Sequence, residues 1–384
     1  MMPTLHGVDP LTGTRTLSNA REWLHAHLDT RSHPFNAIAV EEARRVVDGL
    51  PGLEPEPWAE AWLAAARTFE ARALAALSRD RPADAREAWW QAYQFAFLGR
   101  YPTPLHPAKQ FAYDEARRYF LKAGALDGVE RVEVPIADGD REGRDRVTFY
   151  LARPDTATAS APVVLVWGGV DAWKEETYVR TAGLRRDGIA TIHLDMPGVG
   201  ESPLFAGPRG ERMWDPVFDW IDRSDLDSAR VAVLGLSFGG YWAMKLAHTH
   251  RERLTAAVNW GGGVHRTFQV AWQERSRGAG SYLMDLMAAR ARIFGGTTFE
   301  DYIARCPELS LLDQGVLDRP SCDLLLVNGK DDRQNDPTDT YLSLEHGSPK
   351  TARLFPGGHM GDGPVGATVA AWLRDRLAPA NTAS

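Results

Sequence analysis

Residues Val231-Ala-Val-Leu-Gly-Leu-Ser-Phe-Gly-Gly240 form a short apolar run that ends in a Gly-x-Ser-x-Gly pattern. In a nucleophile elbow, a serine occupies a strained turn between a buried strand and a helix, and crowded chain segments require small residues on both sides of it. Gly235 and Gly239 meet that requirement. The turn also points the N-terminus of the following helix, with its partial positive charge, at the reacting centre. Ser237 is therefore the candidate nucleophile.

The flanking residues distinguish an elbow from an ordinary glycine-bounded turn, which can carry the same five-residue pattern. Arg230–Leu234 is rich in β-branched and apolar residues, as expected of a buried parallel strand. Gly240–His250 has apolar residues on nearly every side, which is typical of a buried helix. Strand, elbow and helix therefore come in the required order.

A serine nucleophile needs a base and an orienting carboxylate, and in one class of serine enzymes the acid and then the histidine follow the serine along the chain. Asp323–Gly329 reads as a strand that ends at a turn, and Asp332 comes three residues after its last glycine. Asp332 is the candidate acid. Asp331 and Asp336 remain alternatives, because one acid of such a cluster usually caps a turn.

The candidate base is His359, in the glycine-rich loop after a last short strand at Thr351–Phe355. Such a loop gives a histidine the position and mobility that a general base needs. A lone loop histidine is more often solvated, but its place after the acid-bearing strand favours a catalytic role. His265 and His346 are possible substitutes, although neither follows a strand in the required way.

The backbone N–H groups of Phe238 and Val170 are the candidate oxyanion donors. Phe238 directly follows the nucleophile, and the second donor in such sites comes from the loop after an earlier strand. Pro162–Trp167 is that strand, and the glycines at 168 and 169 allow the backbone close to the developing oxyanion. In the same loop, Lys174 and Glu175 either form a network at a helix start or face the substrate, and the first reading is favoured.

Three tryptophans near the expected active-site loops are candidate substrate contacts: Trp173, Trp214 and Trp260. They suggest an apolar pocket for an aromatic acyl group. The aromatic stretch Trp89–Phe97 points in several directions at helical spacing, which favours packing.

The chain changes character at about residue 125. Residues 1–125 read as helices separated by Pro and Gly clusters, without strand alternation. Residues 126–384 begin with a hairpin and continue with alternating strands and helices, which indicates a mostly parallel sheet covered on both faces. Residues 265–317 delay the next strand by more than a crossover needs, so we expect a helical lid insertion there.

Composition limits the classes of function. The 384 residues are 44% hydrophobic, enough for a sizeable core, and the formal net charge of −7 leaves no basic footprint for nucleic acid. Two cysteines, Cys306 and Cys322, are too few for a disulfide framework and fit no zinc spacing. Neither a signal peptide nor a membrane-spanning run is evident. We expect a cytoplasmic protein without nucleic-acid or membrane partners, and a homodimer through the helical region is possible.

Three segments carry a family resemblance: Gly168-Gly-Val-Asp-Ala-Trp-Lys-Glu175, Asp195-Met-Pro-Gly-Val-Gly-Glu-Ser202 and Gly235-Leu-Ser-Phe-Gly239. The chain resembles the α/β-hydrolase superfamily, in particular the group of FrsA-type esterases, 2,6-dihydroxypseudooxynicotine hydrolase and fungal polyketide-shortening hydrolases. The resemblance covers residues 125–380 well and the helical region more loosely. It implies a triad of Ser237, Asp332 and His359 and a helical N-terminal domain that helps to enclose the site.

The expected chemistry is acyl-enzyme hydrolysis of an ester, or of a carbon–carbon bond next to a ketone, without a metal or cofactor. An acyltransferase or cyclase with the same triad is the alternative within enzymes. A ligand-binding protein that has kept the fold is the alternative outside them, since fold alone does not carry function.

Overall fold

The computed structural model describes residues 14–154, 156, 160–277 and 282–379. The expectation on a signal peptide concerns the first residues of the chain, which lie outside the described ones. The chain divides into two compact units. The first spans Met1–Glu130 and Arg277–Ala289, and the second Arg131–Ser276 and Arg290–Ser384. The expected insertion at 265–317 is thus shared between both units.

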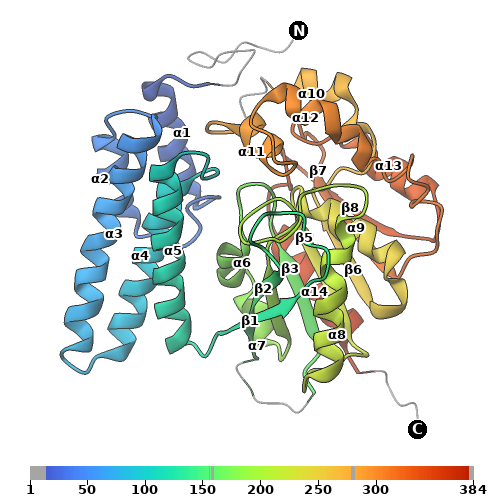
Figure 1. The fold of residues 1–384 in the computed structure, drawn as a ribbon, viewed down its shortest axis with the longest axis horizontal. Coiled ribbons are helices and arrows are strands. Elements are labelled where there is room, and N and C mark those ends of the chain that lie inside the picture. Colours follow the sequence, from blue (N-terminus) through green and yellow to red (C-terminus); the bar gives the residue numbers. More distant parts are fainter. Residues whose placement is uncertain (1–13, 155, 157–159, 278–281, 380–384) are drawn as a thin grey trace. The chain divides into compact units, whose positions relative to one another are not determined.

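The first unit is built on five helices (Figure 1): α1 Leu17–Thr30, α2 Val40–Gly49, α3 Pro55–Leu77, α4 Pro82–Arg100 and α5 Pro107–Leu126. A proline in the first turn starts each of α3, α4 and α5, where its missing N–H costs no hydrogen bond. Every residue from Ala92 to Arg100 is buried. Phe95 of this stretch stacks on Phe69 with ring centroids 5.2 Å apart. The expected packing role of the aromatic stretch is confirmed.

The second unit contains an eight-stranded sheet in the order β1-β2-β4-β3-β5-β6-β7-β8. The strands are β1 Glu130–Pro135, β2 Arg146–Ala152, β3 Val163–Trp167, β4 Ala190–Leu194, β5 Val231–Leu236, β6 Ala256–Trp260, β7 Asp323–Gly329 and β8 Thr351–Phe355. β2 runs antiparallel to β4, and the strands from β4 to β8 across the sheet are parallel. The predicted mostly parallel sheet is confirmed.

Helices cover both faces of this sheet. The remaining helices of the chain are α6 Lys174–Arg180, α7 Ala182–Arg186, α8 Asp215–Arg223, α9 Gly239–Thr249, α10 Val270–Ser276, α11 Leu286–Arg292, α12 Phe299–Arg305, α13 Thr338–Glu345 and α14 Val365–Leu377. Val164 and Val166 of β3 lie in one apolar cluster with residues of α7 and α14. Trp167 points to the opposite face because strand side chains alternate, and there it packs near Trp214, which in turn packs against Trp242 of α9.

The strand register brings the candidate site residues to one edge of the sheet. Trp167 pairs with Gly235, Leu236 with Trp260, and Trp260 with Val327, so the carboxyl ends of β3, β5, β6 and β7 are aligned. Ligands of open α/β sheets bind outside these carboxyl ends. In the part of the chain that the structure describes, none of the helices is both long and apolar enough to span a membrane.

Candidate active site

Ser237 sits on a strained turn between β5 and α9. Its φ of +56° lies in the left-handed region, which is uncommon for a residue with a side chain. A Cβ added to Gly235 would lie 2.1 Å from the carbonyl oxygen of Gly239, and one added to Gly239 would lie 2.3 Å from that of Gly168. Only glycine fits at either position, so the local geometry is that of a nucleophile elbow.

A continuous hydrogen-bonded chain joins the serine to the histidine and the acid. Ser237 Oγ lies 2.7 Å from His359 Nε2, and His359 Nδ1 lies 2.8 Å from Asp332 Oδ2. With Asp332 ionised, Nδ1–H donates to the carboxylate, which leaves Nε2 free to accept the serine proton. The structure thus brings together the three residues that the sequence singled out.

The alternative acids and bases lie outside this chain of hydrogen bonds. Asp331 is exposed, and Asp336 Oδ1 accepts from the backbone N–H of Thr338 at 2.9 Å, where it caps the start of α13. His265 Nδ1 lies 2.7 Å from the hydroxyl of Ser310. His346 Nδ1 lies 2.7 Å from the carboxylate of Asp318. None of these contacts includes Ser237 or another member of the chain of hydrogen bonds.

Asp332 is buried but strongly hydrogen-bonded. Its Oδ1 accepts from the backbone N–H groups of Gln334 and Asn335 at 2.8 and 3.1 Å, and its Oδ2 accepts from Asn328 Nδ2 at 2.9 Å. Burial by itself raises the pKa of Asp332, but the charge and hydrogen bond of His359 and the other donors outweigh it. The pKa of this carboxyl is therefore lowered, and it is ionised at neutral pH.

Asn328 is a site residue that the sequence reading missed. Besides its bond to Asp332, its Oδ1 accepts from the backbone N–H of Gly329 at 2.8 Å and from that of Met360 at 3.0 Å. Because Met360 directly follows His359, one side chain holds both the acid and the loop of the base. The sequence feature that could have identified Asn328 is its place directly after the apolar run Leu324–Val327, near the end of the predicted strand.

The loop after β3 lies against the elbow. A Cβ on Gly169 would lie 3.0 Å from Ser237 Cβ and 3.2 Å from the backbone nitrogen of Phe238. Val170 follows in the same loop and is buried. This places the loop of the second expected donor beside the first one, while the donation from Val170 itself remains a prediction.

The three candidate substrate tryptophans have different surroundings. Trp214 is fully buried and packs beside Trp167 and Trp242, and substrate contact stays a prediction for it. Trp173 is also buried, and its Nε1 donates to the carbonyl of Val170 at 3.1 Å. Trp260 is half-buried and donates to the carbonyl of Met360 at 2.8 Å. Substrate contact remains a prediction for Trp173 and Trp260.

Comparison with known proteins finds similar hydrolases. The family described as "Esterase FrsA-like" matches residues 38–343. Esterase FrsA of Photobacterium profundum is 25% identical over 90% of this chain and 83% of its own length. Hydrolase phmG of Phaeosphaeria nodorum is 28% identical over 59% of this chain, and the match spans 56% of that fungal protein.

Two solved structures share the fold over nearly the whole chain. The 2,6-dihydroxy-pseudo-oxynicotine hydrolase superposes with a TM-score of 0.69 at 22% identity, covering 93% of this chain and 96% of its own. Wild-type AbyA5 superposes with a TM-score of 0.71 at 21% identity, and the match covers 95% of this chain and 99% of AbyA5. At this identity the likeness shows the fold.

Proposed function

The chain belongs to the FrsA-like esterase family and is an α/β-hydrolase, and on that premise we propose that it cleaves its substrate with Ser237 as nucleophile. The observation that carries the proposal is the unbroken hydrogen-bonded chain Ser237–His359–Asp332 at the carboxyl edge of the sheet. A buried, ionised Asp332 fixes the imidazole in the tautomer that accepts a proton at Nε2.

The proposed reaction has two halves. Ser237 Oγ attacks the substrate carbonyl while His359 takes its proton, and the N–H groups of Phe238 and Val170 hold the oxyanion of the tetrahedral intermediate. Collapse breaks the bond to the leaving group, which receives the proton from His359. Water then attacks the acyl-enzyme by the same steps in reverse order and regenerates the serine.

Two leaving groups are compatible with this machinery. From an ester, the alkoxide leaves with the proton of His359. From a β-dicarbonyl compound, the carbon–carbon bond breaks, its electron pair forms an enolate that the second carbonyl stabilises, and the proton goes to carbon. Support for a small aromatic or polyketide-like acyl group comes from the half-buried Trp260, which donates to the carbonyl of Met360, the residue after His359, at 2.8 Å.

The test is turnover of a panel of p-nitrophenyl esters and aryl β-diketones by the parent chain and its Ser237→Ala variant. We expect Ser237→Ala to lower kcat by about 10⁴-fold or more, since loss of a nucleophile removes covalent catalysis as a unit. Ser224→Ala serves as the matched control, because Ser224 precedes the amino end of β5, at the opposite edge of the sheet. The ester-to-diketone ratio of the parent identifies the leaving group. Near-normal turnover by Ser237→Ala would refute the proposal.

A further inference from the structure

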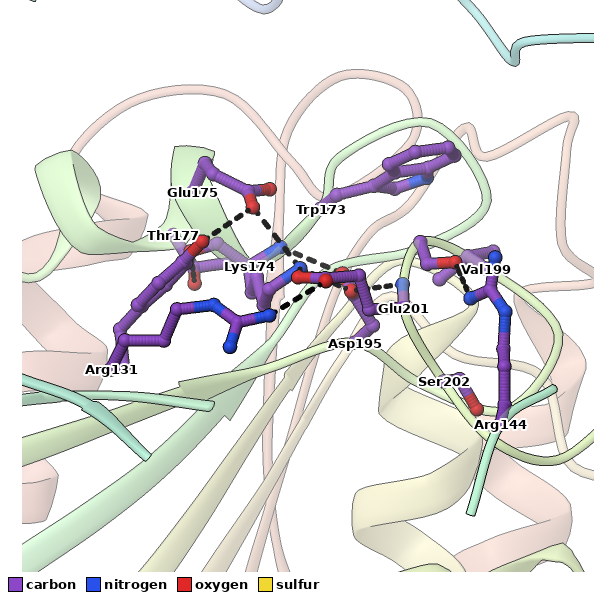
Figure 2. Close-up of polar contacts among 12 residues, drawn as sticks. Arg131, Arg144, Trp173, Lys174, Glu175, Thr177, Asp195, Val199, Glu201 and Ser202 are labelled. Atoms are coloured by element: carbon purple, nitrogen blue, oxygen red, sulfur yellow. Dashed lines mark hydrogen bonds and ion pairs between the residues drawn. The ribbon is translucent and has the colours of Figure 1, made fainter. Parts of the chain in front are cut away.

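A buried cluster of charged side chains lies where α6 begins and β4 ends. Lys174 Nζ lies 3.1 Å from Glu175 Oε1, 2.7 Å from Asp195 Oδ2 and 2.9 Å from Glu201 Oε2. Arg131 of β1 reaches the other oxygen of Glu201 at 2.9 Å. Figure 2 shows Lys174 among these three carboxylates. The side chain of Lys174 is 0% exposed and that of Asp195 1%, so the pair is fully withdrawn from water.

Such a cluster is poor evidence for added stability, since desolvation of buried ions offsets much of their attraction. Its clearest effect is on the backbone. Asp195 Oδ1 accepts from the backbone N–H of Lys174 at 3.0 Å, and its Oδ2 accepts from that of Glu201 at 2.8 Å. Asp195 therefore fixes the first residue of α6 twice, through the main chain and through the ammonium group of Lys174.

The segment fixed in this way is the far end of the loop that lies against Ser237. This loop, residues 168–173, is a tight turn: a Cβ on Gly168 would lie 1.8 Å from the carbonyl oxygen of Ala172. Trp173 closes it by donating to the carbonyl of Val170 at 3.1 Å. At its near end, Trp167 Nε1 donates to the carbonyl of Gly239 at 2.8 Å. The loop is thus anchored to the elbow at one end and to Asp195 at the other.

We propose that Lys174 is a positioning residue for the reaction: by clamping the end of loop 168–173 on Asp195, it sets the backbone of Val170 beside Ser237. The inference rests on the proposed function, because it needs an oxyanion at that place. A misplaced donor loses transition-state stabilisation while substrate binding is kept, so kcat falls and KM does not. A merely structural role would lower the amount of folded protein without changing the turnover of each active site.

The first variant combines Lys174→Met with Asp195→Asn, which removes one charge of each sign. Glu201 keeps its ion pair with Arg131, and Glu175, which loses the ammonium group, keeps the hydrogen bond from the hydroxyl of Tyr150 at 3.2 Å. The matched control combines Lys245→Met with Glu211→Gln. Lys245 is also a buried lysine of the second unit, with Nζ 2.9 Å from Glu211 Oε2, and its contacts do not include loop 168–173. A second variant, Trp173→Phe, removes the ring nitrogen that donates to Val170 and leaves every charge in place, so it tests the loop even if the double variant does not fold.

The measurements are kcat and KM for a p-nitrophenyl ester per active site titrated with a fluorophosphonate, and the inhibition constant of an aryl trifluoromethyl ketone, which adds to the serine as a tetrahedral adduct. Loss of one oxyanion donor costs about 10²–10³ in kcat, so we expect displacement in the double variant to cost about 10–100-fold, with similarly weaker ketone inhibition. KM of the double variant should stay within about twofold. Trp173→Phe should show a smaller fall in kcat and a smaller weakening of ketone inhibition, and these two readouts decide the test for this variant, because Trp173 is also a candidate substrate contact.

The inference is overturned if both loop variants keep the parent's kcat per titrated site and ketone inhibition, whatever happens to Tm. It is equally overturned if the Lys245 control loses as much turnover per site as the Lys174 variant. Failure of the proposed function looks different: the parent would not be titrated by the fluorophosphonate, and Ser237→Ala would keep its turnover.

Discussion

Asn328 bears on both the acid and the base of the proposed site. Its amide group donates to Asp332 and its oxygen accepts from the backbone beside His359, so it favours the ionised acid and holds the base loop. A donor to a carboxylate lowers its pKa, because it stabilises the charged form. Asn328 is therefore one of the groups that offset the effect of burial on Asp332.

The variant Asn328→Asp removes the amide N–H that donates to Asp332 and keeps the oxygen that accepts from the backbone. The new carboxylate still accepts from the N–H groups of Gly329 and Met360 but faces Asp332 with like charge, which raises the pKa of Asp332. Because the proposed mechanism needs the ionised acid, which is lost as pH falls through its pKa, we expect the acid limb of the kcat/KM profile to move to higher pH.

The control for this variant is Asn259→Asp on the neighbouring strand β6, where Asn259 bonds only to the backbone of Gly262 in the contacts described. The acid limb should stay in place there. An unmoved limb in Asn328→Asp would contradict the expectation that this amide supports catalysis through the ionised acid.

At the residue scale, the sequence predicted the three members of the hydrogen-bonded chain because their order and their places after strands follow from the topology. Asn328 was not predicted as a site residue, because its partners Asp332 and Met360 are brought together only by the register of β7 and β8. The burial of Trp214 was not predicted either, because its partners Trp167 and Trp242 lie on separate elements that come together only in the fold.

At the scale of elements, the elbow depends on close contact between β5, α9 and the loop after β3. Gly239→Ala would place its Cβ 2.3 Å from the carbonyl oxygen of Gly168, and this oxygen belongs to the backbone and cannot rotate away. We expect a loss of about 1–3 kcal/mol in the free energy of unfolding, the usual cost of overpacking. Turnover should fall as well, because Gly168 begins the loop beside Ser237.

Urea unfolding measures the effect, with Gly183→Ala in α7 as the matched control. The nearest atom to a Cβ at Gly183 is 3.9 Å away, so alanine fits and should raise stability by up to about 1 kcal/mol through helix propensity. If Gly239→Ala were as stable and active as the parent, the crowding described at the elbow would be wrong.

Strand positions were predicted closely because apolar runs between turn residues identify buried strands without knowledge of their neighbours. Asp323–Gly329, which is buried from Leu324 onward, agrees residue for residue. The insertion was harder: the described residues of the expected lid at 265–317 contain the short helices Val270–Ser276, Leu286–Arg292 and Phe299–Arg305. Residues Arg277–Ala289 belong with the N-terminal helices, which a local sequence pattern cannot show.

At the scale of the whole molecule, the chain passes between its two units three times, since Arg277–Ala289 belongs with the helices and interrupts the second unit. Within the first unit, Arg15 Nε donates to the carbonyl of Tyr282 at 3.0 Å, and Tyr101 stacks on the Tyr282 ring. Lys109 Nζ lies 3.4 Å from Asp285 Oδ2. A single boundary at residue 125 does not assign Arg277–Ala289 to the first unit, because the contacting residues are more than 150 positions apart in the sequence.

Asp285→Asn should destabilise the first unit, because Lys109 is buried and would lose this carboxylate. Burial lowers the pKa of Lys109, and Asp285 opposes the shift. Since Asp285 is 52% exposed, solvent screening limits the loss to about 1 kcal/mol. As pH approaches 10, Lys109 of the unfolded Asp285→Asn variant binds more protons than Lys109 of the folded variant. The free energy of unfolding of the variant therefore rises with pH, and its deficit relative to the parent becomes smaller.

Thermal unfolding between pH 7 and 10 tests this, with Lys109→Met/Asp285→Asn as the companion variant. We expect the double variant to regain the lost Tm and to show no such pH dependence. A pH-independent loss in the single variant would mean that Lys109 charge is not its cause.

The central claim, that Ser237 is the nucleophile activated by His359 and Asp332, is tested most directly by intact-mass and peptide mapping of the whole chain after reaction with a fluorophosphonate. The account predicts one adduct per chain, located on Ser237, absent in Ser237→Ala, and formed far more slowly in His359→Ala and Asp332→Asn. An adduct on another serine, or labelling of Ser237→Ala at the parent's rate, would contradict it.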